Sequence, residues 1–426
     1  MPSEEGVRER GPAGPIILLA IGIVLLYGFG FYNLLFLVSP FLPIIIDFIN
    51  FALPWLAGYW WAGLVFIALL IVLGFGLAYI ILKLMKRAAA GTLRVLWVLQ
   101  AVFMIAIGIF FFLFLGPFGF IGLIFPFIGI IQFWVWFRRR QKIERAGKLV
   151  EFTAQLLLEE KEMFIVPLVT AVFSLLTGIL MMATYGAMYT WLPSIGIPTD
   201  SWIFFLLSIL MQIPYLFVYF AVFYIFDGIN ISIAHTWYRE EDPILRGGVR
   251  EVRQVLGTII QFAALRTAVS VGQSAIRQGT ARQGGILAVI GGIFARIIGA
   301  IFRFINYFTL PAIIIERRRL IDSIKRSVHV TWQYLVDVYI AETGVSTVFS
   351  FFGGLLTLGF LAAGFLFGYV FAIILSVDFF LALLAGIVFA IFFSIFASIP
   401  SYFIFRPLNT AYRTFMFAYA LDEESG

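Results

Sequence analysis

The segment from Phe304 to Glu342, FINYFTLPAIIIERRRLIDSIKRSVHVTWQYLVDVYIAE, decides how the chain is organised. An apolar run ends at Ile315, four charged residues follow at once, and an amphipathic segment begins. Its apolar residues recur three or four positions apart, which makes one stripe along a helix. They are Ile321, Ile324, Val328, Trp332, Leu335 and Tyr339. The pattern indicates a helix that leaves a bilayer, a basic anchor, and then a helix along the membrane surface.

The composition of the whole chain supports a membrane location. Hydrophobic residues make up 62% of it and charged residues 12%, against about 25% charged residues in soluble globular proteins. No soluble core could cover that much apolar surface, so lipid must be the solvent for much of it. The net charge of +6 then indicates anchors that face anionic lipid, and we expect no nucleic-acid partner.

A transmembrane helix needs about 20 apolar residues. The sequence offers ten such segments, and we expect an all-α polytopic membrane protein with about ten spans and a lower bound of eight. The segments are 16–38, 59–82, 95–115, 118–137, 163–190, 201–226, 254–276, 286–315, 343–375 and 379–405. Gly116-Pro117 and residues 190–201 are the expected turns.

Lys and Arg residues indicate the orientation. Alternate connections hold 24 of the 29 basic residues, and the intervening turns hold none. Because basic loops stay on the cytoplasmic side, this pattern predicts a plasma-membrane protein with both termini in the cytoplasm.

The remaining basic residues lie in one region that permits two topologies. In the first, 254–276 crosses outward and 286–315 returns, which gives ten spans. In the second, 243–283 stays on the cytoplasmic surface and 286–315 forms a re-entrant hairpin, which gives eight. We favour the first, because VLGTIIQFAALRTAVSVG is apolar enough to span with a single arginine.

Three amphipathic stretches predict helices on the cytoplasmic surface, at 140–162, 243–260 and 316–340. All three lie beyond the first four predicted spans, which lack such helices. We therefore expect a four-span N-terminal membrane unit over 1–140 and a larger C-terminal unit over 141–426.

Three motifs from Glu159 onward carry a family resemblance. They are EEKEMFIVPLV with Pro167, Asp242-Pro243 followed by Gly247-Gly248, and FTLPAIIIERRRLIDSIKRSVHVTW with Pro311 and Glu316. Over residues 159–420 the chain resembles an uncharacterised prokaryotic polytopic membrane family, catalogued as domain of unknown function 6159. The third motif is also similar to membrane domains attached to some glycerophosphodiester phosphodiesterases. The resemblance implies a related fold and no activity.

Ionisable residues at membrane depth are costly and are functional candidates by default. Arg266, Arg296 and Arg303 fall inside predicted spans. One hypothesis is a basic pocket for a lipid phosphate or an anionic solute. The other is that their heads reach the interface or pair with acids on neighbouring helices. Gly291, Ala295 and Gly299, spaced four apart, would let another helix approach beside these arginines.

A second set of residues is predicted to anchor the chain at the membrane surface. It consists of Arg317, Arg318, Arg319, Lys325, Arg326 and Trp332. No catalytic motif, metal-ligand spacing or cofactor-binding pattern is found, and His235 and His329 have the wrong spacing for a helical histidine pair.

The sequence thus predicts a non-enzymatic membrane protein without a metal or cofactor. We expect it to bind or organise lipid or to scaffold a membrane complex, with membrane lipids as partners and other membrane proteins as further candidates. The alternative is a transporter or channel for a small anionic or lipid-like substrate, with Arg266 and Arg303 along the path.

Overall fold

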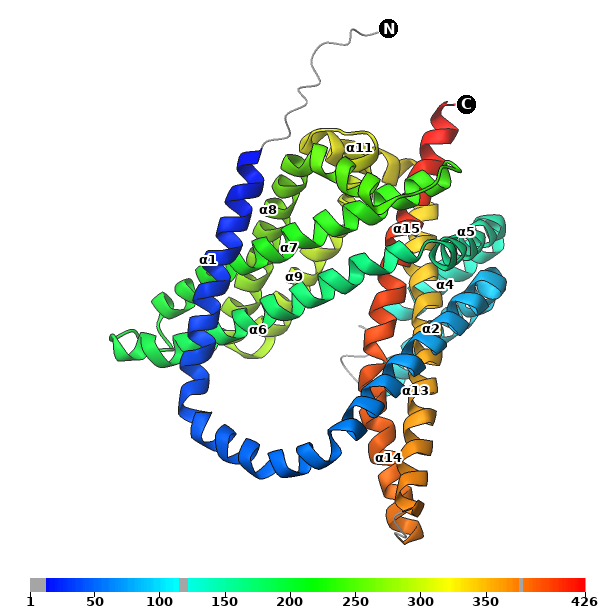
Figure 1. Ribbon diagram of the computed structural model, residues 1–426. Helices are drawn as coiled ribbons and strands as arrows, with labels where there is room; N and C mark the ends of the chain where they lie inside the picture. Colours follow the sequence, from blue (N-terminus) through cyan, green and yellow to red (C-terminus); the bar gives the residue numbers. More distant parts are fainter. Residues whose placement is uncertain (1–12, 115–121, 375–377, 426) are drawn as a thin grey trace. The chain divides into compact units, whose positions relative to one another are not determined.

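The computed structural model describes residues 13–114, 122–374 and 378–425, and in these ranges it is helical and contains no strand (Figure 1). Short 3₁₀ turns at Ser39–Phe41 and Lys161–Phe164 and a π-helical turn at Ala341–Val345 join some of the helices. The α-helices are α1 (Ala13–Val38), α2 (Leu42–Phe114), α4 (Ile124–Arg138), α5 (Arg140–Glu159), α6 (Ile165–Ser194), α7 (Trp202–Tyr238), α8 (Leu245–Gln283), α9 (Gly285–Ile305), α10 (Thr309–Ile315), α11 (Leu320–Gln333), α12 (Leu335–Ile340), α13 (Ser346–Ile374), α14 (Phe379–Phe396) and α15 (Ser398–Ser425).

The helices group into two compact units, each built from separate stretches of sequence. Unit 1 contains the described residues up to Gly63 together with Ile165–Thr331 and Met416 onward. Unit 2 contains the described residues of Leu64–Phe164 and Trp332–Phe415. The boundary near residue 140 stays a prediction.

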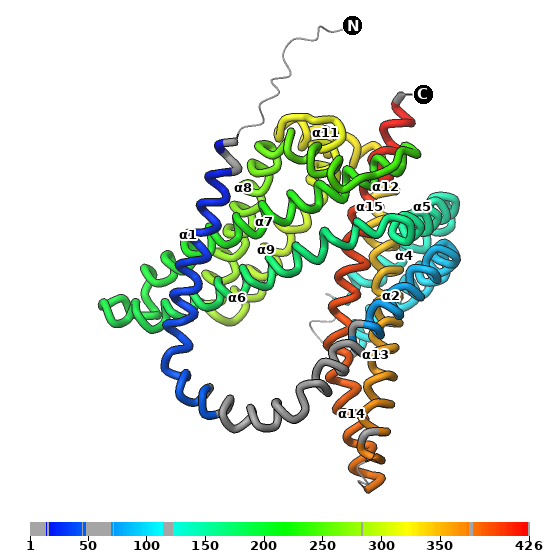
Figure 2. Tube along the Cα trace, in the orientation of Figure 1, coloured from blue at the N-terminus to red at the C-terminus, as the bar shows by residue number. Residues whose placement is uncertain are grey.

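In unit 1, α7 and α8 run side by side, and α6 and α9 pack on their outer sides (Figure 2). Helix α1 packs mainly on α6. Tyr27 of α1 is hydrogen-bonded to Thr177 of α6, and Thr184 of α6 is bonded to the Tyr215 hydroxyl of α7 at 2.7 Å. These buried hydroxyl pairs satisfy polar groups that lipid could not.

In unit 2, α13 and α14 form a tightly packed pair. Gly364 and Gly368 permit the close approach, because an added Cβ would lie 2.6 Å and 2.7 Å from the carbonyl oxygens of Phe389 and Ala385. Trp97 of α2 is fully buried and donates from Nε1 to the Gln132 carbonyl at 2.9 Å.

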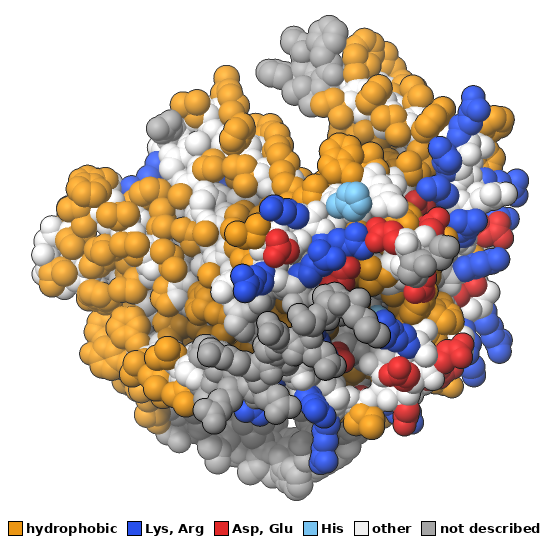
Figure 3. All heavy atoms as spheres, turned by 90° about the horizontal axis from the view of Figure 1, so that it is seen from above, with side chains coloured by type: hydrophobic (Ala, Val, Ile, Leu, Met, Phe, Trp, Pro, Cys, Tyr) orange, Lys and Arg blue, Asp and Glu red, His pale blue; other side chains and the backbone are white. Residues whose placement is uncertain are grey.

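Eight helical segments in the described ranges are long and apolar enough to cross a membrane. This confirms the polytopic helical fold at the lower end of the expected number of spans. Many large hydrophobic side chains on these helices are exposed, as lipid-facing residues are (Figure 3). Residues 254–276 lie within α8, and residues 286–315 comprise most of α9 and the short α10, with a break between them. Which of the two topologies applies stays a prediction.

The count is below ten for two reasons. The predicted spans 59–82 and 95–115 fall in one helix, the 73-residue α2, so no turn separates them. The basic segment between them, KLMKRAAAGTLR, is rich in strong helix formers and has no proline, and one glycine does not break a helix. The predicted span 118–137 is represented by the 15-residue α4, and Gly116-Pro117 lies outside the described residues.

Two of the three predicted surface helices are separate elements, α5 and α11. The third, 243–260, forms the first part of α8, which continues from Leu245 to Gln283 without a break, so this amphipathic stretch runs directly into the apolar one. Helix α5 buries its apolar face in protein: Val150 and Ala154 are fully buried, and Gly147 touches Ala90 of α2. Arg94 of α2 pairs with Glu144 at 3.2 Å. The charged middle of α2 is therefore partnered by α5.

Candidate functional site

Polar and aromatic side chains follow the contact between α7 and α8 along most of its length. Ser274 of α8 donates to the Gln212 side chain of α7 at 3.2 Å. Further along, the Tyr224 and Phe262 rings lie 4.7 Å apart, and Gly248 packs against Ile229. We call this line of contacts the α7–α8 seam. It consists of Gln212, Phe220, Tyr224 and Ser232 on α7, Glu251, Phe262, Arg266, Ser274 and Gln278 on α8, and Phe302 on α9.

At the end of the seam nearest the α8–α9 turn, amide and hydroxyl groups bond to one another. Gln278 donates to Ser274 at 2.9 Å, which extends the link from Gln212. Gln273 donates to the Ala295 carbonyl of α9 at 2.9 Å. Arg282 lies 4.8 Å from the centre of the Phe205 ring. This end can therefore exchange hydrogen bonds with a polar solute.

Arg266 occupies the middle of the seam, between two aromatic rings. Its guanidinium carbon lies 5.3 Å from the centre of the Phe220 ring and 5.1 Å from that of Phe302. Its Nη1 atom is buried and has no hydrogen-bond partner among the described residues. A cation over a desolvated ring gains about 2 kcal/mol, whereas moving an ion out of water costs several kcal/mol. The rings only partly offset that cost, and an oxygen ligand would stabilise the guanidinium further.

Beyond Tyr224, α7 also carries a buried carboxylate, Asp227, and a buried amide, Asn230. Asp227 lies seven residues beyond Phe220 and so shares its face of α7. Asn230 is 1% exposed, and neither its Oδ1 nor its Nδ2 has a partner in the described part of the chain. Ser232 donates to Glu251 of α8 at 2.6 Å. The Ser232–Glu251 hydrogen bond therefore continues the polar line towards the predicted cytoplasmic side.

Arg296 and Arg303 are both exposed on α9, so Arg266 alone of the three is enclosed by aromatic rings. The buried face of α9 is formed by Gly291, Ala295 and Gly299, which confirms the predicted close approach of another helix. That helix is α8: an added Cβ at Gly299 would lie 2.5 Å from the Gln273 amide nitrogen. Ligand binding by the three arginines stays a prediction.

The predicted membrane anchors lie on and before α11. Arg326 pairs with Glu316 at 3.2 Å and with Glu424, and Arg318 pairs with Glu316 at 2.6 Å. Hydrogen bonding to Glu424 is the main cause that raises the pKa of Arg326 above its usual value, helped by the charges of both carboxylates. Arg317, Arg319 and Lys325 are exposed, and Trp332 is 64% exposed. Arg318 and Arg326 are thus engaged within the protein, and membrane anchoring by this set of residues stays a prediction.

The segment from α9 to α10 is interrupted at Asn306–Phe308. Ser327 of α11 spans the interruption: its hydroxyl accepts from the Phe308 N–H at 2.9 Å and donates to the Ile305 carbonyl at 2.7 Å. Thr309 donates to the Asn306 side chain at 3.0 Å. Broken helices that line a cavity or a protein interior are a recurring feature of transporters.

Sequence patterns found Arg266 but not its surroundings. Phe220 and Phe302 are two of 50 phenylalanines, and nothing in the sequence separates them from lipid-facing residues. Asn230 did leave a signal, because it is an amide three residues after Asp227 in an otherwise apolar run. In the described part of the chain, no group of His, Asp and Glu side chains could hold a metal ion.

A bundle of membrane-spanning helices with a polar seam along one contact and a broken helix beside it has the features of a membrane transporter. Residues 123–424 match a family model described as plasma-membrane choline transporter. The match covers more than half of the chain, and the chain belongs to this family. No curated protein matches it significantly.

The family match corrects the predicted resemblance to domain of unknown function 6159, which is wrong. That resemblance relied on a proline near the end of a span, an acid at its exit and a basic helix after it. Such residues serve the exit of any membrane helix, so short motifs of this kind do not separate one family from another. The match also favours the transporter alternative over the expected scaffold or lipid-organising role.

Proposed function

We propose that the chain transports a small trimethylammonium solute through unit 1, along the α7–α8 seam. The observation that carries this proposal is the buried, unpartnered Nη1 atom of Arg266 between two phenylalanine rings. Choline, the solute in the family description, carries an oxygen that could accept from Nη1. Aromatic faces are also the usual binding surface for quaternary ammonium groups.

Electrostatics in the seam indicate how the solute would be oriented. The oxygen end would contact Arg266, because a hydrogen bond to a charged donor contributes about 1.5–3 kcal/mol. The trimethylammonium group would lie away from Arg266, towards Tyr224 and the Asp227 carboxylate. Glycine betaine has the same ammonium group and a carboxylate in place of the hydroxyl, so it should bind Arg266 more strongly than choline.

Uptake into proteoliposomes tests the proposal. The purified full chain should take up radiolabelled choline and glycine betaine above the level of protein-free liposomes. Arg266→Gln should reduce uptake about 10- to 100-fold, the loss expected for a hydrogen bond to a charged group. Arg296→Gln is the matched control, because Arg296 is exposed on α9, and it should retain uptake.

Two results would overturn the proposal. One is uptake of neither solute above protein-free liposomes. The other is an Arg266→Gln protein that transports as well as Arg296→Gln does. Location in the plasma membrane and cytoplasmic termini belong to the same proposal, and they agree with the distribution of basic residues along the chain.

A further inference from the structure

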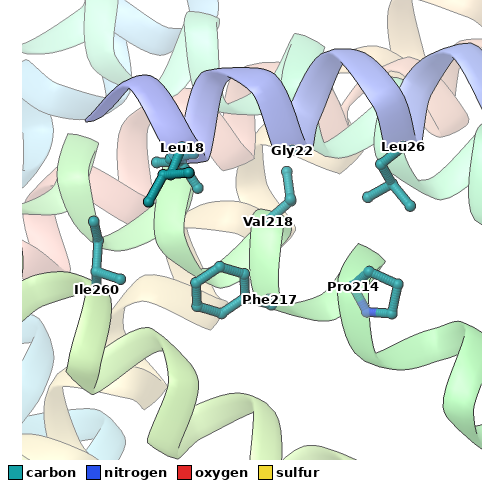
Figure 4. Close-up of a pocket in the computed structure, with 8 residues that line it drawn as sticks. Leu18, Gly22, Leu26, Pro214, Phe217, Val218 and Ile260 are labelled. Atoms are coloured by element: carbon teal, nitrogen blue, oxygen red, sulfur yellow. The ribbon is translucent and has the colours of Figure 1, made fainter. Parts of the chain in front are cut away.

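Helices α1, α7 and α8 enclose an apolar cavity of about 360 Å³ (Figure 4). Leu18, Gly22 and Leu26 of α1 face Pro214 and Phe217 of α7 across it. Leu19, Val218 and Ile260 complete the lining. Every lining residue is apolar, and an apolar cavity of less than half this size stays dry and binds benzene.

The cavity is partly open, and its lining residue Leu18 lies on the exposed surface of α1. Leu18 is 71% exposed and its neighbour Ile17 is 55% exposed, as lipid-facing side chains are. Gly22 helps to keep the space free, because a Cβ added there would meet no atom within 4 Å. The hydrocarbon region of a bilayer around α1 consists of acyl chains. An acyl chain is therefore the occupant whose chemistry matches the apolar lining.

A basic side chain lies where the headgroup of that lipid would be. Arg253 precedes Ile260 by seven residues, so the two share one face of α8 about 10 Å apart along the axis. Arg253 is exposed, and it lies towards the start of α8, on the predicted cytoplasmic side. The polar layer of a bilayer is about 5–8 Å thick on each side. The separation of about 10 Å along α8 is slightly more than the thickness of this layer. A phosphate at Arg253 would therefore lie in the polar layer, while the acyl chain in the cavity would lie in the hydrocarbon region.

We propose that α1, α7 and α8 bind one anionic phospholipid, with an acyl chain in the cavity and its phosphate at Arg253. The two parts of the site have different roles. The cavity selects for an acyl chain whatever the headgroup, and Arg253 adds the preference for a net negative headgroup, because a zwitterionic headgroup carries a compensating ammonium. This site is separate from Arg266 and does not depend on the transported solute.

Native mass spectrometry of the purified full chain tests both parts, with phosphatidylglycerol and phosphatidylcholine of identical acyl chains as probes. The unchanged protein should retain one phosphatidylglycerol and bind phosphatidylcholine more weakly. Gly22→Leu, which fills the cavity, should reduce retention of both lipids at least about tenfold, because an acyl chain could no longer bury its apolar surface there. Arg253→Gln should weaken phosphatidylglycerol binding about fivefold, the effect of one basic residue at the surface, and leave phosphatidylcholine unchanged.

Gly28→Leu is the matched control. Gly28 is also an exposed α1 glycine with open space around it, and it does not line the cavity. It should keep the lipid, and both leucine variants should elute and melt as the unchanged protein does. Equal retention by Gly22→Leu and Gly28→Leu would overturn the acyl-chain site. Equal affinity of the unchanged protein for the two lipids would overturn the role of Arg253.

Discussion

At the scale of single residues, α7 and α8 contain buried polar atoms that have no partner among the described residues. A buried donor or acceptor without a partner costs about 1–3 kcal/mol, and Arg266 and Asn230 both carry such atoms. Groups of this kind persist where a ligand or a second state of the protein uses them. Asn33 offers a contrast in the same unit, because its amide donates to the Phe29 carbonyl at 3.0 Å and contacts Thr184 at 3.5 Å.

The two asparagines should therefore respond in opposite directions to the same substitution. Asn230→Leu should raise the free energy of unfolding by about 1–3 kcal/mol, since it removes an unsatisfied amide. Asn33→Leu should lower it by about 1 kcal/mol, since it removes satisfied hydrogen bonds. Denaturation of both variants in the same detergent would measure the difference. Equal destabilisation would mean that Asn230 is a structural residue with partners.

Arg266 could be identified from the sequence alone, because it is a charged residue inside an apolar run. Its rings come from α7 and α9, 46 and 36 positions away in the chain, and only packing brings them to one place. The pairing of Ser274 with Gln212 is hidden for the same reason. Candidate residues could thus be predicted singly, whereas the site they form could not.

At the scale of elements, α11 shows that a periodic pattern does not decide which face of a helix is buried. The predicted apolar stripe exists, and Ile321 and Trp332 on it are 67% and 64% exposed. The buried residues of α11 are Ser323, Ser327, Val330 and Thr331, and three of these four are small and polar. In a soluble protein the apolar stripe would face the core, but beside a bilayer it can face lipid while small polar residues pack on protein. Periodicity predicts the helix and its two faces, and the surrounding solvent decides which face is buried.

The break between α9 and α10 depends on one of those serines. Ser327→Ala should leave the Phe308 N–H, which is fully buried, without an acceptor, at a cost of about 1–3 kcal/mol. Hydrogen exchange at residues 306–310 should become faster. Ser323→Ala is the control, because the Ser323 hydroxyl donates to the Arg318 carbonyl at 3.3 Å, away from the break. Unchanged exchange in the Ser327 variant would show that the break is held by other interactions.

At the scale of the whole molecule, composition and charge were sufficient for the class of fold. They could not show that α2 continues through its basic segment, because Lys and Arg mark a loop and also favour a helix. They also could not show that each unit draws on distant parts of the sequence. Short motifs led to the wrong family, whereas a pattern extending over residues 123–424 identified the right one.

The central claim is that solute passes along the α7–α8 seam, and labelling of a single cysteine tests it most directly. The chain has no cysteine, so Ser274→Cys introduces one thiol beside Gln212. We predict that a charged methanethiosulfonate reagent will block uptake and that choline or glycine betaine will slow the modification. Ser194→Cys, at an exposed residue near the end of α6, should be labelled without loss of uptake or protection by solute. Full uptake after complete modification at residue 274, or no protection there by a transported solute, would contradict a path along the seam.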